Sequence, residues 1–252
     1  DRKFESRNSS RPSQIVGMFQ KATLPMVDEA VAEAEAAFQS WSRKSVEDRV
    51  SLLLKLSKLM QERRLELAAW MVFEVGKPWT EADADVTEAI DFCEFYAREA
   101  LRIGARQGLT PVDGEENYLR YIPLGVGVVI PPWNFPLAIL TGMTTAAIVT
   151  GNTAIVKPSS DSPAIAAKLA EMATQAGFPP GVVNYLTGSG SEIGDALVSH
   201  PRVRFIAFTG SREVGVRING LAARVCPGQI WIKRAILEMG GKDAIIVDSE
   251  SD

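Results

Sequence analysis

The second half of the chain alternates short apolar runs with amphipathic helical patterns, and this alternation constrains the fold more than any other feature. The runs GVGVVI, TAIVK and VRFIAFTG are rich in β-branched residues and show no polar alternation. Such runs, separated by helical segments that end at Gly151 and Gly177, are typical of a parallel sheet covered by helices on both faces. We therefore predict an α/β fold with a doubly wound, Rossmann-like parallel sheet and a ligand at the carboxyl ends of its strands.

The residues before position 113 show a helical pattern instead. The segments VDEAVAEAEAAFQSW and SVEDRVSLLLKLSKLMQERR have apolar residues at helical spacing, and in the second Ser45 precedes Asp48 by three positions, as in a capping box. Two more helices are predicted through LELAAWMVFEVG, which Gly76 would end, and TEADADVTEAIDFCEFYAREALRIG. The predicted order is therefore N-terminal helices followed by the sheet.

Charge and residue counts exclude several classes of protein. The net charge is −4 and the basic residues are scattered among acids, so we expect no nucleic-acid partner. The two cysteines, Cys93 and Cys226, stand in unrelated contexts, and His200 is the single histidine, which argues against a disulfide framework and a metal site. Cys93 is expected to be a small buried apolar residue.

Residues 121–156 carry no charge, which raises the question of a membrane segment. Prolines and glycines interrupt this stretch, whereas a spanning helix needs about 20 continuous apolar residues. We therefore expect a buried core and no membrane partner. The start at Asp1 is not expected to be the natural one, and DRKFESRNSSRPSQ lacks the apolar region of a secretory signal, so we expect a cytoplasmic protein.

Polar residues follow three of the predicted strands. Asn134, in PPWNFP, could donate its amide to a developing oxyanion or cap the following helix. Lys157, in KPSS, could reach a ribose or phosphate or be solvated. Gly210 and Ser211 begin a helix whose free amides would suit a pyrophosphate, although GSREVG differs from the GxGxxG fingerprint. The strand ends therefore predict the ligand site, with two alternatives open for Asn134 and Lys157.

Four motifs in order along the chain, PWNFP, KPSS, FTGSREVG and LEMGGK, resemble those of the NAD(P)-dependent aldehyde dehydrogenase superfamily. The resemblance runs over essentially the whole chain. Within the superfamily, PGQIWIKR and GFPPGVVNYLTG are similar to the 1-pyrroline-5-carboxylate dehydrogenases, which oxidise L-glutamate γ-semialdehyde to L-glutamate in proline and arginine catabolism. The resemblance implies an enzyme that oxidises a small aldehyde with NAD.

The resemblance also implies roles for single residues. Asn134 would be the side-chain arm of an oxyanion hole, and Glu238 would be the general base that activates water to hydrolyse a thioester. An apolar pocket around Glu238 would disfavour its charged form, as suits a base. The implied cofactor contacts come from Ile130, Pro132, Trp133, Lys157, Ser160, Gly190, Gly194, Thr209, Gly210, Ser211 and Val214.

Cofactor choice depends on Ser160. Many NAD-preferring relatives carry a glutamate at this place, whose carboxylate accepts a hydrogen bond from the ribose and repels a 2′-phosphate. A serine hydroxyl brings no such repulsion, so NADP is expected to be accepted alongside NAD.

The family nucleophile is a cysteine downstream of LEMGGK, in a Gly-Gln-x-Cys context. Cys226 precedes Glu238 and matches no nucleophile position, so the resemblance implies an N-terminal fragment that is inactive alone. It assigns residues 1–113 and 124–239 to the cofactor domain, 114–123 to the first strand of an oligomerisation hairpin that needs a C-terminal partner strand, and 240–252 to the start of the catalytic domain. The full-length protein would be a homo-oligomer. The alternative is a non-catalytic nucleotide-binding or interaction module derived from such an enzyme.

Overall fold

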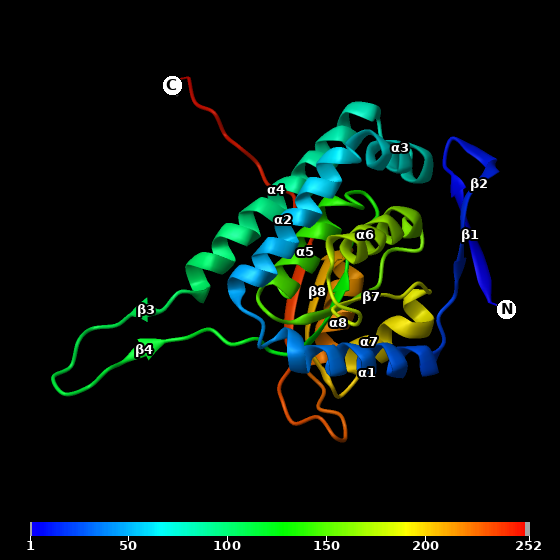
Figure 1. Cartoon of the computed structure of the whole chain (residues 1–252). Helices are drawn as coiled ribbons and strands as arrows, with labels where there is room; N and C mark the ends of the chain where they lie inside the picture. The colour runs from blue at the N-terminus through cyan, green and yellow to red at the C-terminus, as the bar shows by residue number, and fades with distance from the viewer. Residues whose placement is uncertain (1, 250–252) are drawn as a thin grey trace.

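A five-stranded parallel sheet forms the centre of the protein, whose structure is a computed structural model that describes residues 2–249. The strand order is β7-β6-β5-β8-β9. The first strand of the sheet, β5, is therefore central; β6 and β7 follow on one side of it, and β8 and β9 lie on the other side. This sheet confirms the predicted α/β fold (Figure 1). Its strands are β5 (Val126–Ile130), β6 (Thr153–Val156), β7 (Val183–Tyr185), β8 (Val203–Gly210) and β9 (Arg234–Met239).

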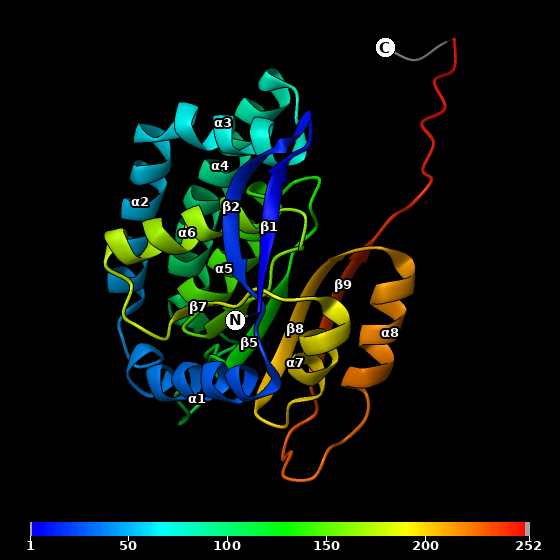
Figure 2. The same ribbon diagram turned by 90° about the vertical axis from the view of Figure 1, so that its right-hand side faces the viewer.

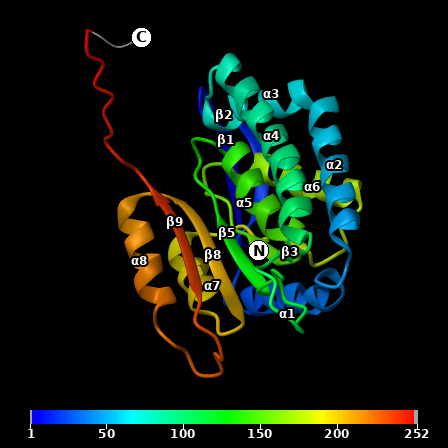
Figure 3. The same cartoon turned by 90° about the vertical axis from the view of Figure 1, so that its left-hand side faces the viewer.

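Helices cover both faces of the sheet, and each face has its own apolar core (Figures 2 and 3). Adjacent residues of β5 point into different cores, Val128 into one and Val129 into the other, because successive side chains of a strand alternate. One core is built on α1 (Leu24–Trp41), α7 (Asp195–Ser199) and α8 (Arg212–Ala222). The other is built on α2 (Val46–Glu62), α3 (Arg64–Val75), α4 (Trp79–Gly104), α5 (Ala138–Val149) and α6 (Pro163–Ala176).

The predicted signals at the helix ends are present. The Ser45 hydroxyl accepts a hydrogen bond from the Asp48 N–H at 3.1 Å, which caps α2. Gly76 ends α3 in the left-handed conformation with φ of 70°, which glycine adopts without a steric penalty. The charge-free stretch becomes β5, α5 and β6, which are largely buried. Among residues 2–249, none of the helices combines the length and apolar character that a membrane span requires.

The N-terminal segment is a β-hairpin, so the helical prediction is wrong for this part of the chain. Strands β1 (Lys3–Asn8) and β2 (Arg11–Gln20) pair antiparallel and lie beside α3 and α6 (Figure 2). The Asn8 side chain accepts hydrogen bonds from the N–H groups of Ser10 and Arg11 and closes the turn. The Ser9 N–H donates to Phe73 O at 3.2 Å, so the hairpin depends on contact with α3.

A second, shorter hairpin projects from the end of α4 (Figure 1). It consists of β3 (Gln107–Gly108) and β4 (Tyr118–Leu119), which pair antiparallel. The strand predicted within 114–123 therefore pairs with an upstream strand on one of its two edges. The expected C-terminal partner strand would pair with the other edge and stays a prediction. The role of this hairpin in oligomerisation stays a prediction.

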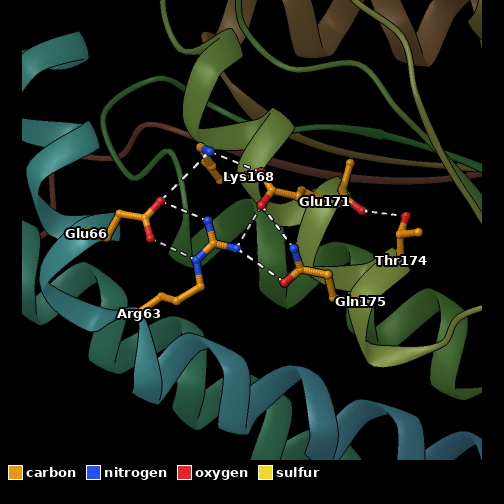
Figure 4. Close-up of polar contacts among 7 residues, drawn as sticks. Arg63, Glu66, Lys168, Glu171, Thr174 and Gln175 are labelled. Atoms are coloured by element: carbon orange, nitrogen blue, oxygen red, sulfur yellow. Dashed lines mark hydrogen bonds and ion pairs between the residues drawn. The ribbon is translucent and has the colours of Figure 1, made fainter.

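A polar network connects α6 to the junction of α2 and α3 (Figure 4). Arg63, at this junction, donates to both carboxylate oxygens of Glu66 and, at 3.0 Å, to Glu171 of α6. These carboxylates raise the pKa of Arg63. Lys168 of α6 approaches Glu66 and Glu171 as well. Exposed ion pairs contribute little to stability, so we expect this network to add little to the free energy of unfolding.

Candidate functional site

A groove of about 1000 Å³ lies at the carboxyl ends of β5, β6 and β8. It lies at the point where the strand order reverses, between β5 and β8, which is where open α/β sheets bind their ligands. The volume is at the upper end of the range for small-molecule sites, about 300–1,000 Å³. The groove can therefore hold a ligand of dinucleotide size.

Every cofactor residue implied by the motifs lines this one groove. Asn134 lines it too, so the structure brings together the polar residues that follow the three predicted strands. The residues with an implied cofactor contact that line it are Ile130, Pro132, Trp133, Lys157, Ser160, Gly190, Gly194, Thr209, Gly210, Ser211 and Val214.

Asn134 is exposed in the loop between β5 and α5 and does not cap a helix. Helix α5 begins at Ala138, directly after Leu137, which has no capping hydrogen bond of its own. The Ala138 N–H instead donates to Oδ1 of Asp85, on α4, at 2.6 Å. The capping alternative is therefore wrong, because a residue from another helix takes that place.

Lys157 is buried, so the solvated alternative is wrong as well. Only 5% of the residue is exposed, and its Nζ donates to the Pro158 carbonyl at 3.2 Å. Burial lowers the pKa of Lys157 from 10.5 to about 8. An ammonium group has three donors, and Pro158 O is its one hydrogen-bond acceptor among the described residues, so the group can also bind the oxygen of a ligand.

Removing the Lys157 charge is expected to change the pH dependence of stability. Between about pH 8 and 10.5 the unfolded chain holds this proton and the folded chain does not, so the free energy of unfolding rises with pH. The rise from this group is at most about 1.4 kcal/mol per pH unit. We expect Lys157→Met to lack this rise in the free energy of unfolding. The measurement is urea unfolding at pH 7.5, 8.5 and 9.5.

The matched control for this change is Lys55→Met, at an exposed position of α2. The difference in unfolding free energy between the parent and Lys157→Met should grow with pH, whereas the difference for Lys55→Met should stay constant. A constant difference for both variants would contradict the lowered pKa of Lys157.

Glycines and a helix start form the other wall of the groove. Gly190 and Gly194 bound a single π-helical turn, η1 (Gly190–Gly194), and a Cβ added to either would meet nothing within 4 Å. A flat ligand group can therefore approach the backbone here. The Ser211 hydroxyl accepts from the Val214 N–H at 3.3 Å and caps α8, so the first amides of α8 lie at the groove, where they suit an anion.

Several residues that line the groove were not identified from the sequence. Arg217 and Ile218 lie on the same face of α8 as Val214, which the resemblance does imply, and their spacing of three and four residues from it could have indicated this. Arg217 forms an ion pair with Asp195 of α7, which no local pattern could have shown. The further lining residues are Pro131, Phe135, Ile139, Ser159, Asp161, Ser191, Val198, Phe208, Arg212, Met239, Gly240 and Lys242.

Glu238 is exposed on the edge strand β9 and does not line the groove. It pairs in register with Thr209, whose hydroxyl donates to the Met143 sulfur of α5 at 3.7 Å, so Glu238 lies on the α5 side of the sheet. The described residues form no apolar pocket around Glu238, because β9 is the last strand and α5 packs over the strands nearer the centre. Its role as a base stays a prediction.

The cysteines lie outside the groove. Cys93 is fully buried in α4, and burial raises the pKa of its thiol to about 12, as expected of a structural residue. Cys226 is partly exposed in the connection between α8 and β9. Within residues 2–249 there is no group of three or more His, Cys, Asp or Glu residues that could hold a metal ion.

A parallel sheet with a large groove at its switch point, lined by glycines, a helix start and a buried lysine, is the architecture of a dinucleotide-binding α/β domain. The chain belongs to the aldehyde dehydrogenase family, whose model matches residues 1–252.

Individual relatives agree with this assignment. The chain is 53% identical to a 1-pyrroline-5-carboxylate dehydrogenase of Geobacillus thermodenitrificans, over 99% of this chain and 48% of the relative. A Thermus 1-pyrroline-5-carboxylate dehydrogenase with bound NAD is 52% identical, with a TM-score of 0.93 over 96% of this chain and 47% of that one. Proline utilization A from Bdellovibrio bacteriovorus gives a TM-score of 0.94 at 46% identity, over 95% of this chain and 25% of that one. The chain spans about half the length of the curated relatives it matches.

Proposed function

We propose that this chain is the cofactor-binding half of an enzyme that oxidises an aldehyde to a carboxylic acid with NAD. The observation that carries the proposal is that every residue with an implied nucleotide contact lies in one groove of sufficient size. We further propose L-glutamate γ-semialdehyde as the substrate, within proline and arginine catabolism. The similarity to proteins named 1-pyrroline-5-carboxylate dehydrogenase supports this part of the proposal.

The groove residues fit the nucleotide by their chemistry. The Lys157 ammonium would bind the adenosine ribose, the start of α8 at Ser211 would bind the pyrophosphate, and the open backbone at Gly190 and Gly194 would lie against the adenine. NAD, when bound, supplies the acceptor for the two electrons that leave the aldehyde. The protein's part is to orient the nucleotide along the strand ends.

The chemistry of the aldehyde would depend on two residues of this chain. The amide of Asn134 would donate to the aldehyde oxygen as negative charge develops there. Glu238 would remove a proton from the water that releases the acid. We propose that the nucleophilic cysteine lies outside these 252 residues, so that the chain alone is inactive. The full protein is proposed to be a homo-oligomer without nucleic-acid or membrane partners.

Calorimetric titration of the 252-residue chain with NAD tests the proposal. We expect saturable binding that Gly194→Phe abolishes, because the new ring would enter the open side of the groove. The control is Gly220→Phe, since Gly220 has the same free space around it but lies outside the groove. A parent chain that does not bind NAD, or equal loss in both variants, would rule out this site.

Cofactor choice gives a second prediction. Ser160 is exposed and lines the groove, so its hydroxyl can contact the ribose without repelling a 2′-phosphate. We expect the complete enzyme to accept NADP with only a modest preference for NAD, and Ser160→Glu to sharpen that preference. The measurement is the ratio of kcat/KM for the two cofactors.

The neighbouring Asp161 provides the control, because its carboxylate lines the same groove. Asp161→Asn should leave the cofactor ratio unchanged if position 160 sets the choice. Strong selectivity for NAD in the parent that disappears in Asp161→Asn would assign the repulsive charge to Asp161 instead.

A further inference from the structure

The two helices that follow the groove loops begin without caps of their own. The loop 131–137, which carries Asn134, leads from β5 into α5, and the loop 157–162, which carries Lys157 and Ser160, leads from β6 into α6. Neither Leu137 nor Ser162, the residues directly before these helices, makes a side-chain capping hydrogen bond. The first N–H groups of both helices therefore need partners from elsewhere.

Both sets of partners come from one short segment, which we call the α3–α4 corner (residues 74–85). Asp85 accepts from the Ala138 N–H of α5 at 2.6 Å. Glu74 accepts from the N–H groups of Ala164 and Ile165 of α6, at 2.7 and 3.0 Å. One corner thus supplies a carboxylate to the start of each helix, where the helix dipole favours negative charge.

Two further contacts fix these carboxylates. Lys77 forms an ion pair with Asp85, and its ammonium lies 4.0 Å from the centre of the Phe135 ring, next to Asn134 in the loop 131–137. Glu74 also accepts from the Ser6 hydroxyl of the N-terminal hairpin at 2.8 Å. The corner therefore contacts the first groove loop through Lys77 and is itself held by the hairpin.

Burial gives these contacts a fixed geometry. Asp85, Glu74 and Lys77 are 1%, 4% and 9% exposed, and none of them lines the groove. Burial raises the pKa of both carboxyl groups, against the opposing effect of their hydrogen-bond donors. Buried ionic groups are weak contributors to net stability, so their arrangement calls for another explanation.

We propose that the α3–α4 corner positions the two groove loops independently: Asp85 with Lys77 sets the loop of Asn134, and Glu74 sets the loop of Lys157 and Ser160. All three are positioning residues that act through the starts of α5 and α6. The inference rests on the proposed function, because it assigns the adenosine end of the nucleotide to one loop and the reacting end to the other.

The test is a pair of variants of the complete enzyme with opposite expected effects. Glu74→Gln loses the charged acceptor at α6, so the Kd of AMP, a probe for the adenosine end, should rise about tenfold while kcat at saturating NAD stays within about twofold. Asp85→Asn should leave the Kd of AMP within about twofold and lower kcat about tenfold. General destabilisation would not produce this crossed pattern.

Each variant has a matched control on the same helix. Glu66→Gln is on α3 and also lies across from α6, but in the exposed network around Arg63. Asp83→Asn is on α4 and removes an exposed pair with Arg64. Neither control should change the Kd of AMP or kcat.

The outcomes separate the inference from the proposed function. A parent that neither binds AMP nor oxidises the aldehyde contradicts the proposed function. An active parent whose two variants change both parameters alike, or neither, overturns the corner as a positioning device. If a variant does not fold, amide hydrogen exchange of the parent provides the test. Residues 74–85 do not line the groove, yet AMP should increase the protection of their backbone amides from exchange. Unchanged protection would overturn the inference.

Discussion

Replacing Asn134 with alanine is expected to slow aldehyde oxidation by the complete enzyme by a factor of about 10²–10³. Asn134 is exposed in a loop at the groove and does not cap α5. Its side-chain amide is therefore expected to be able to donate a hydrogen bond to the aldehyde oxygen. The loss should appear in the first NADH-forming turnover, measured by stopped-flow absorbance. The Kd of NAD should change little, because the nucleotide contacts remain.

The control for this variant is Asn219→Ala, an exposed amide of α8 that lies outside the groove. It should leave the rate of the first turnover unchanged. An Asn134→Ala enzyme with a normal first turnover and slow later ones would show that Asn134 acts after the oxidation step, and the oxyanion assignment would be wrong.

Glu238→Gln is expected to separate the two halves of the reaction. A glutamine cannot take a proton from water, so release of the acid should slow by about 10²–10⁴ while the first turnover survives. The expected record is a burst of NADH followed by a slow steady rate. Because Glu238 is exposed on β9 in this chain, we propose that the rest of the enzyme covers it.

The control for Glu238→Gln is Glu213→Gln, which makes the same chemical change at an exposed position of α8. It should alter neither the burst of NADH nor the steady rate. Loss of the burst in Glu238→Gln would assign the residue to oxidation, and an unchanged steady rate would remove it from the mechanism altogether.

The sheet and the groove could be predicted from the sequence because their signals are local. The runs that become β5, β6 and β8 are apolar without alternation, which only a sheet covered on both faces explains well. Because these strands are parallel, the residues directly after them lie together at the carboxyl ends of the sheet. Their gathering into one groove follows from the parallel order of the strands and needs no knowledge of side-chain contacts.

The features that were missed depend on contacts between distant parts of the chain. The hairpin of β1 and β2 is polar along most of its length and is held by Phe73 and Glu74, so its own sequence carries little signal beyond the turn at Asn8. Asparagine is a favoured capping residue, so the local sequence allows Asn134 this role. The residue that accepts the hydrogen bond at the start of α5 is instead Asp85, which stands 53 positions upstream. A local pattern cannot show such a pair.

The distances along the chain between the α3–α4 corner and its two partners determine the order in which the groove can be assembled. Asp85 precedes Ala138 by 53 positions, and Glu74 precedes Ala164 by 90. During synthesis from the N-terminus, both carboxylates emerge from the ribosome early and stay hydrated until the later helices are made, and contacts of such long range form slowly. A nascent chain that has passed Ala138 but not Ala164 can anchor the loop of Asn134 while the loop of Lys157 is still without its anchor.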